Sequence, residues 1–167
     1  MIRALLASLL AATALSCPAR ADDSPSSAVE RRLSEATRSH GITVVHLWAP
    51  WCPNCRAELA GGGWSGFIAA NPGVNFVFVT IWSQADGRDL LVKNGVGAEG
   101  NFELLAHPNT SRKAGERLTE LLGVPVSWIP TTWIFRDGRL CYAMNYGELR
   151  FPMLQQLIRD SSESWDR

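Results

Sequence analysis

The sequence has 167 residues, the length of one compact domain with a short appendage, which excludes two large domains. Its 16 basic and 16 acidic residues balance, so the chain has no strong positive field to attract nucleic acid or anionic lipid. Because 46% of the residues are apolar and only 19% are charged, we expect a sizeable core rather than disorder or a disulfide-rich miniprotein.

The first 21 residues are typical of a secretory signal peptide. One basic residue, Arg3, precedes a mostly apolar run over residues 4–15, and Ala19 and Ala21 form a small-residue cleavage site. The run is shorter than the roughly 20 residues that cross a bilayer, which disfavours a permanent membrane anchor.

Removal of this leader leaves residues 22–167 as a single soluble domain, in the periplasm or otherwise secreted, where cysteines can be oxidised. A lipoprotein anchored at Cys17 is the alternative. Residues 22–40 are expected to form an N-terminal linker followed by one amphipathic helix over residues 28–39.

Two buried strands are expected next, at residues 42–48 and 74–82, because both are short apolar runs rich in β-branched residues. A turn and a helix that contain the first cysteines lie between them, so the two strands should be parallel. The glycines at residues 61–63 predict a break in that helix, since each costs about 1 kcal/mol in a helix interior.

The second half of the chain predicts further helices and a hairpin. Residues 95–108 show no clear period, and the dipeptide Asp137-Gly138 predicts the hairpin turn. In the final helix, Met153, Leu157 and Ile158 are expected to face inward. The expected elements are helices at 85–94 and 111–122, strands at 131–135 and 140–146, and a helix at 152–159. This order favours an α/β architecture with a mixed central sheet flanked by helices.

Cys52 and Cys55 are the candidate reactive groups. Cys52 would begin a helix, where free backbone N–H groups and the positive end of the helix dipole favour a thiolate nucleophile. Pro53 is compatible with the first turn, and Cys55 lies one turn further, near enough to resolve a mixed disulfide. A zinc site is disfavoured because no second Cys or His pair has ligand spacing.

Two segments resemble the signatures of the thioredoxin superfamily. Residues 44–55, VVHLWAPWCPNC, are similar to its active-site segment, and residues 128–138, WIPTTWIFRDG, are similar to its second signature. Their order and separation resemble the secreted TlpA-like and ResA-like thioredoxins over about residues 40–160. The resemblance implies a thioredoxin fold with an N-terminal extra helix and an insertion between the second core strand and the hairpin. It also implies a cis peptide bond at Pro130, which would face the cysteine pair.

The resemblance further implies an extracytoplasmic thiol-disulfide oxidoreductase that acts on protein cysteines and needs no bound cofactor beyond the redox-active cysteine pair. Similarity to the TlpA-like branch favours a reductant that receives electrons from a membrane thiol carrier. The expected substrate groove involves five residues: Trp51, Pro53, Asn54, Trp128 and Ile129. The backbone of Ile129 would pair with an extended substrate chain.

The chain departs from the family at His46. Cytoplasmic thioredoxins have a buried acid there, six residues before the first cysteine. One interpretation is that His46 accepts the proton of Cys55. The other is that it is a core histidine with satisfied hydrogen bonds. Cys141 is expected to fill the core.

Three other functions remain open from the sequence. A general disulfide oxidase would use the same cysteine pair in the opposite direction. A copper- or metal-handling module would keep the fold and use Cys52 and Cys55 as thiolate ligands, which suit Cu(I). A pure interaction domain is disfavoured because both signatures are intact.

Overall fold

A computed structural model describes residues 25–144 and 149–163, with side chains from residue 28 onward. The predicted leader and Cys17 lie outside the described residues, so the signal peptide stays a prediction. Within the described residues, no helix is both long and apolar enough to cross a membrane.

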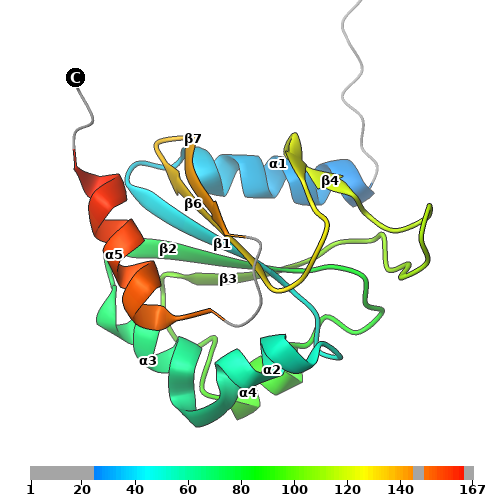
Figure 1. Ribbon diagram of the computed structural model, residues 1–167, viewed down its shortest axis with the longest axis horizontal. Helices are drawn as coiled ribbons and strands as arrows, with labels where there is room; N and C mark the ends of the chain where they lie inside the picture. The colour runs from blue at the N-terminus through cyan, green and yellow to red at the C-terminus, as the bar shows by residue number, and fades with distance from the viewer. Residues whose placement is uncertain (1–24, 145–148, 164–167) are drawn as a thin grey trace, which may run out of the picture.

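Five strands form one mixed sheet in the order β3-β2-β1-β6-β7 (Figure 1). The strands are β1 (Ile42–Trp48), β2 (Val74–Thr80), β3 (Phe102–Ala106), β6 (Thr131–Arg136) and β7 (Arg139–Met144). The first three are parallel, β6 is antiparallel to β1, and β7 is antiparallel to β6. The mixed sheet and the parallel pairing of the first two strands are as the sequence predicts.

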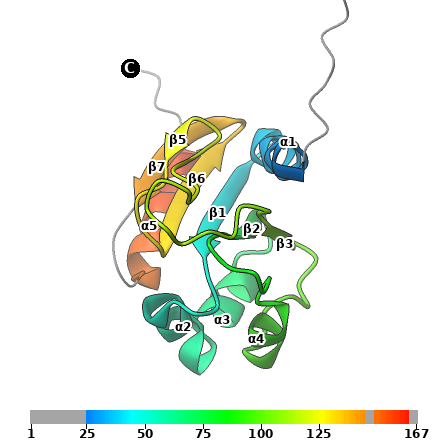
Figure 2. The same cartoon turned by 90° about the vertical axis from the view of Figure 1, so that its right-hand side faces the viewer.

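Helices cover both faces of the sheet. They are α1 (Pro25–Arg38), α2 (Pro53–Leu59), α3 (Gly63–Ala70), α4 (Arg88–Lys93) and α5 (Phe151–Ser162). Figures 1 and 2 show α1 on one side of the sheet and α2, α3 and α4 on the other. The start of α5 packs on α3, where the Phe151 and Trp64 ring centroids are 5.3 Å apart. Strand β1 is thus enclosed, and all seven of its residues are buried.

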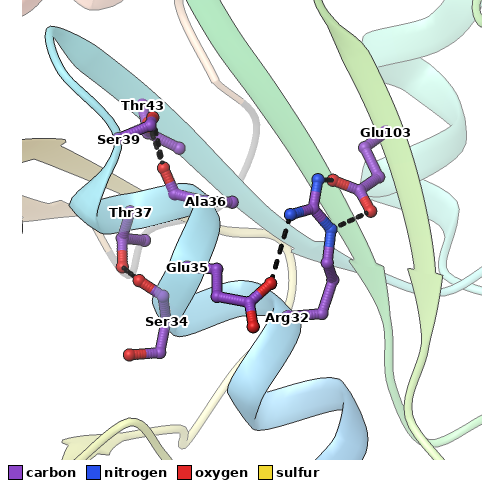
Figure 3. A network of polar contacts seen from close by, with 8 residues as sticks. All are labelled: Arg32, Ser34, Glu35, Ala36, Thr37, Ser39, Thr43 and Glu103. Carbon is purple, nitrogen blue, oxygen red and sulfur yellow. Dashed lines mark hydrogen bonds and ion pairs between the residues drawn. The ribbon is translucent and has the colours of Figure 1, made fainter.

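The N-terminal helix α1 is fixed to the sheet by polar contacts (Figure 3). Arg32 forms two hydrogen bonds to Glu103 of β3, from Nε to Oε1 and from Nη2 to Oε2, each 2.7 Å long. The carbonyl oxygen of Ala36 accepts from the hydroxyls of Ser39 at 2.7 Å and Thr43 at 3.0 Å. These contacts join the extra helix to both an edge strand and the central strand.

The predicted hairpin is present. Asp137 and Gly138 both adopt positive φ, 50° and 83°, which is the geometry of the tight turns that suit twisted antiparallel strands. The Asp137 carboxylate also accepts a hydrogen bond of 2.9 Å from the Gly41 backbone N–H, just before β1. The turn is therefore anchored to the strand that leads to the cysteines.

The prediction of a helix at residues 111–122 is wrong. Its end instead forms a two-stranded ribbon of β4 (Glu120–Leu121) and β5 (Val124–Pro125). Upstream, the Asn109 side chain accepts from Ser111 N at 3.2 Å and donates to Glu116 O at 2.9 Å, and Gly115 has φ 83°. Local side-chain hydrogen bonds of this kind compete with helix formation.

Two other expectations need correction. Strand β3 occupies residues 102–106, where the sequence showed no period, because it pairs as an edge strand with β2. In α5, Met153 is 46% exposed, whereas Leu154 is fully buried and Ile158 nearly so. The helix begins one residue earlier than expected, and its inward face is centred on Leu154 rather than Met153.

Candidate active site

Cys52 lies at the point where the central strand passes into a helix. Strand β1 ends at Trp48, and the Cys52 backbone N–H then donates to the Ala49 carbonyl at 3.0 Å. Cys52 is the N-cap of α2, and its sulfur accepts from the Cys55 N–H at 3.4 Å. Pro53 occupies the first turn, where its missing N–H costs nothing. The sulfur thus takes the place of the oxygen that usually caps a helix.

The two cysteines differ in their relation to the surface groove. Both are free thiols and both are buried, at 4% exposed for Cys52 and 1% for Cys55, but Cys52 lines the groove and Cys55 does not. Burial raises the pKa of Cys55 far above its usual value, and the adjacent Cys52 and Glu58 raise it further. Only Cys52 is therefore presented to a partner from outside.

The second signature forms the facing wall of this groove. The Ile129–Pro130 peptide bond is cis, and the Cys52 sulfur lies 3.8 Å from the Ile129 carbonyl oxygen. The groove has a volume of about 400 Å³. It is lined by Trp51, Cys52, Pro53, Asn54, Trp82, Arg112, Arg117, Ser127, Trp128 and Ile129. All five residues expected from the sequence to bind substrate therefore come together around Cys52.

The tryptophans divide between this groove and the core. Trp51 and Trp128 are 37% and 58% exposed, as befits an apolar rim. Three of the other tryptophans, Trp48, Trp82 and Trp133, are buried, although Trp82 also lines the groove. Trp64 is fully buried, and Trp165 lies outside the described residues.

His46 is enclosed beneath the active-site helix. Its ring is 1% exposed and lies between Trp64 and Phe78, with centroid distances of 4.6 and 4.7 Å. Nδ1 is 3.0 Å from the Thr132 hydroxyl, and Nε2 is 3.3 Å from Oε2 of Glu58. Burial lowers the pKa of His46 to about 3, so the ring is neutral near pH 7. A neutral ring satisfies both contacts if Nε2–H donates to Glu58 and Nδ1 accepts from Thr132.

Glu58 is the site residue that sequence reasoning missed. Glu58 is 2% exposed, and its carboxylate accepts hydrogen bonds from the residues packed around it. These donors include the Leu149 backbone N–H at 2.7 Å, Trp64 Nε1 at 3.1 Å and His46 Nε2 at 3.3 Å. The signal was its spacing of three from Cys55, which places both on the buried face of α2. The buried acid of this site therefore comes from the helix rather than from β1.

The glycine triplet brings the Trp64 indole to the Glu58 carboxylate. The helix breaks there as predicted, into α2, a 3-10 turn η1 (Ala60–Gly62) and α3. Gly61 and Gly62 have φ of 65° and 78°. A Cβ on Gly63 would overlap the backbone carbonyl oxygen of Glu58 and the Phe151 ring. This tight kink turns the chain back, so that Trp64 can reach a carboxylate six residues earlier.

Cys141 lies away from this site on β7 and is half-buried, not in the core as expected. Its sulfur lies 3.6 Å from the Arg139 carbonyl oxygen. The strand is at the edge of the sheet, and none of its six residues is fully buried. Across the described ranges, no three His, Cys, Asp or Glu side chains gather to hold a metal ion.

Comparisons with known proteins find structural relatives. No protein-family model matches the sequence, and no curated protein matches it significantly. Among solved structures, a secreted disulfide oxidoreductase of Mycobacterium tuberculosis, homologous to E. coli DsbE, is 25% identical. The match covers 72% of this chain and 81% of that chain, with a TM-score of 0.51.

Two further structures resemble the chain in fold. A DsbF homologue from Corynebacterium diphtheriae is 21% identical, covering 77% of this chain and 75% of its own, with a TM-score of 0.55. A thiol:disulfide interchange protein from Chlorobium tepidum is 17% identical, with coverages of 75% and 83% and a TM-score of 0.54. The described domain shares its fold with these proteins.

Proposed function

We propose that this chain, a thiol-disulfide oxidoreductase of the thioredoxin superfamily in its TlpA-like and ResA-like branch, reduces protein disulfides outside the cytoplasm through the motif Cys52-Pro53-Asn54-Cys55. One observation carries the proposal. Cys52 caps a helix and faces the groove, while Cys55 is buried one turn behind it.

The reaction proceeds by two thiol-disulfide exchanges. The Cys52 thiolate attacks one sulfur of the substrate disulfide, forms a mixed disulfide and releases the other sulfur as a thiolate. Cys55 then loses its proton and attacks the Cys52 sulfur. This step releases the second substrate thiol and leaves a Cys52–Cys55 disulfide, so two electrons pass from the pair to the substrate.

A buried proton acceptor is needed for the second step, because burial raises the pKa of Cys55. We assign this role to Glu58, which lies three residues after Cys55 on the buried face of α2 and whose charge raises that pKa. His46 is then a positioning residue, since its neutral ring donates to the Glu58 carboxylate. The hypothesis that His46 itself accepts the proton is the competing assignment.

The reducing direction is supported by the surroundings of the pair. Strong oxidants of this superfamily stabilise their reduced form as a thiolate. Here, the residues between the cysteines are uncharged, and Glu58 adds a negative charge that disfavours a second thiolate. A general oxidase would instead need groups that stabilise the Cys52 thiolate.

The compartment and partners follow from the leader and the reaction. Residues 1–21 would direct export to the periplasm or beyond, and the Mycobacterium tuberculosis relative is described as secreted. Outside the cytoplasm, the oxidised pair must be reduced again by a membrane thiol carrier. The lipoprotein alternative would place the same domain at the membrane through Cys17.

Trapping experiments test the roles of the two cysteines. In a Cys141→Ser background, Cys55→Ser should accumulate mixed disulfides that dithiothreitol releases, because attack proceeds and resolution does not. Cys52→Ser should form none and should have no activity. Adducts on the Cys52→Ser variant alone would reverse the two roles.

Insulin reduction and a measured potential test the activity and its direction. We expect catalysis of insulin reduction by dithiothreitol, and a potential nearer to thioredoxin at roughly −270 mV than to DsbA at roughly −120 mV. A copper-handling module would instead bind Cu(I) through both thiolates without accelerating insulin reduction. A potential near that of DsbA would assign the oxidase function.

A further inference from the structure

Two arginines form part of the groove wall beside Cys52. The guanidinium carbon of Arg112 lies 3.8 Å from the centroid of the Trp51 ring, and that of Arg117 lies 4.8 Å from the Trp82 ring. Trp51 directly precedes Cys52, and all four side chains line the same groove. Both positive charges therefore line the groove that Cys52 also lines.

The fold holds these arginines in place. Trp51 Nε1 donates to the Trp82 carbonyl at 2.8 Å, and Trp82 Nε1 donates to the Leu118 carbonyl at 3.0 Å. The second bond links the groove to the segment that carries Arg112 and Arg117. A guanidinium that lies with its face over an aromatic ring keeps the N–H donors at its edges available for a ligand.

No acidic side chain of the described residues neutralises them. None of the groove-lining residues is acidic, and neither guanidinium forms an ion pair within the described ranges. The nearest acid in sequence, Glu116, is held by Ser111 at 3.0 Å and Lys113 at 3.7 Å. The groove thus presents two cations and no carboxylate of its own.

We propose that this groove selects protein substrates with an acidic residue adjacent to the reactive cysteine, whose carboxylate binds Arg112 and Arg117. Guanidinium groups match carboxylates in planar, two-bonded geometry, which favours Asp and Glu over other side chains. The exposed ring of Trp128 would contact apolar side chains of the bound substrate next to its cysteine. This inference rests on the proposed function, because the bound substrate must reach Cys52.

Peptide substrates of matched sequence test this selectivity. Three peptides share a sequence that is otherwise uncharged, carry one cysteine as a 2-pyridyl disulfide and differ in one flanking residue, which is Glu, Gln or Lys. The reduced Cys55→Ser, Cys141→Ser protein attacks the peptide sulfur through Cys52. This forms the mixed disulfide and releases 2-thiopyridone, whose absorbance gives the second-order rate constant at pH 7.

The Glu peptide should react about five- to tenfold faster than the Gln peptide at low salt, and the Lys peptide should be slowest. Added salt should reduce this preference because it screens the charges, so the unsubstituted groove alone provides this test. Adding Arg112→Gln and Arg117→Gln should bring the Glu-to-Gln ratio to about one. Arg139→Gln, which removes one exposed charge at the hairpin, is the matched control and should keep the preference.

A Glu-to-Gln ratio near one in the parent protein would overturn the inference, and so would an equal loss of preference in the Arg139→Gln control. In either case, catalysis of insulin reduction by the unsubstituted protein would still support the proposed function. Failure of all three peptides to react would overturn both.

Discussion

Nε2 of His46 lies 3.3 Å from Oε2 of Glu58, and both side chains are almost completely removed from solvent. One comes from the central strand β1 and the other from the active-site helix α2. A buried carboxylate is stable only with hydrogen-bond donors, and here an imidazole, an indole and a backbone N–H supply them. His46 therefore helps to hold in place the carboxylate that we propose as the proton acceptor.

Replacing the carboxylate should separate the two exchange steps. Glu58→Gln should slow release of the mixed disulfide on the order of a hundredfold, because Cys55 loses its proton acceptor, whereas formation at Cys52 should change less than about threefold. Single-turnover kinetics measures both steps. Glu35→Gln, at an exposed position on α1, is the control. Equal losses in both steps would contradict the assignment.

Removing one donor should alter the pH dependence of release. Trp64→Phe keeps an aromatic ring but removes the bond to Glu58, so the carboxylate becomes easier to protonate. The acid limb of the release rate should move up by about half to one pH unit. Trp48→Phe is the matched control, because its indole N–H has no partner among the described residues. If the acid limb of the release rate is unchanged in Trp64→Phe, the Trp64 hydrogen bond does not stabilise the Glu58 carboxylate.

The buried histidine should make the protein sensitive to acid. The pKa of His46 is about 3 in the folded protein against an ordinary value of 6.5, so below pH 6.5 the unfolded chain binds a proton that the native state does not. Stability should therefore fall by about 1.4 kcal/mol per pH unit from this group as the pH drops toward 3.

His46→Gln should flatten that slope by one proton, since the amide can donate and accept but does not titrate in this range. Urea unfolding of both proteins between pH 7 and pH 4 gives the comparison. Identical slopes would mean that His46 is protonated in the folded state.

The kink after α2 should tolerate no side chain at Gly63. A methyl group there would overlap the Glu58 carbonyl and the Phe151 ring, so Gly63→Ala should lower the free energy of unfolding by about 1–3 kcal/mol. Gly66→Ala, in the same helix but with open space around it, should be neutral or stabilising by up to about 1 kcal/mol. Equal effects in denaturant melts would show that the kink is not tightly packed.

Regular, local patterns made much of the fold predictable. The apolar run of β1 predicted that strand to the residue, and Asp137-Gly138 predicted the hairpin because Gly, Asn and Asp adopt its positive φ more readily than other residues. The helix at 111–122 failed because its apolar spacing could not show that the Asn109 side chain would bond the backbone of that segment. Strand β3 was not predicted because it is held by pairing with β2, a strand that lies more than twenty residues earlier in the sequence.

By itself, the sequence determined the cysteine pair, the helix break and the segments that meet at Cys52, since each depends on residue type and short spacing. Only the tertiary structure decided what surrounds them. It joined His46 of β1, Glu58 of α2 and Trp64 of α3 into one buried network, and it brought Arg112 over Trp51 from sixty-one residues away. Packing forms such contacts between distant segments, and burial then sets their charge states, because a carboxylate or imidazole removed from water depends on the partners that folding supplies.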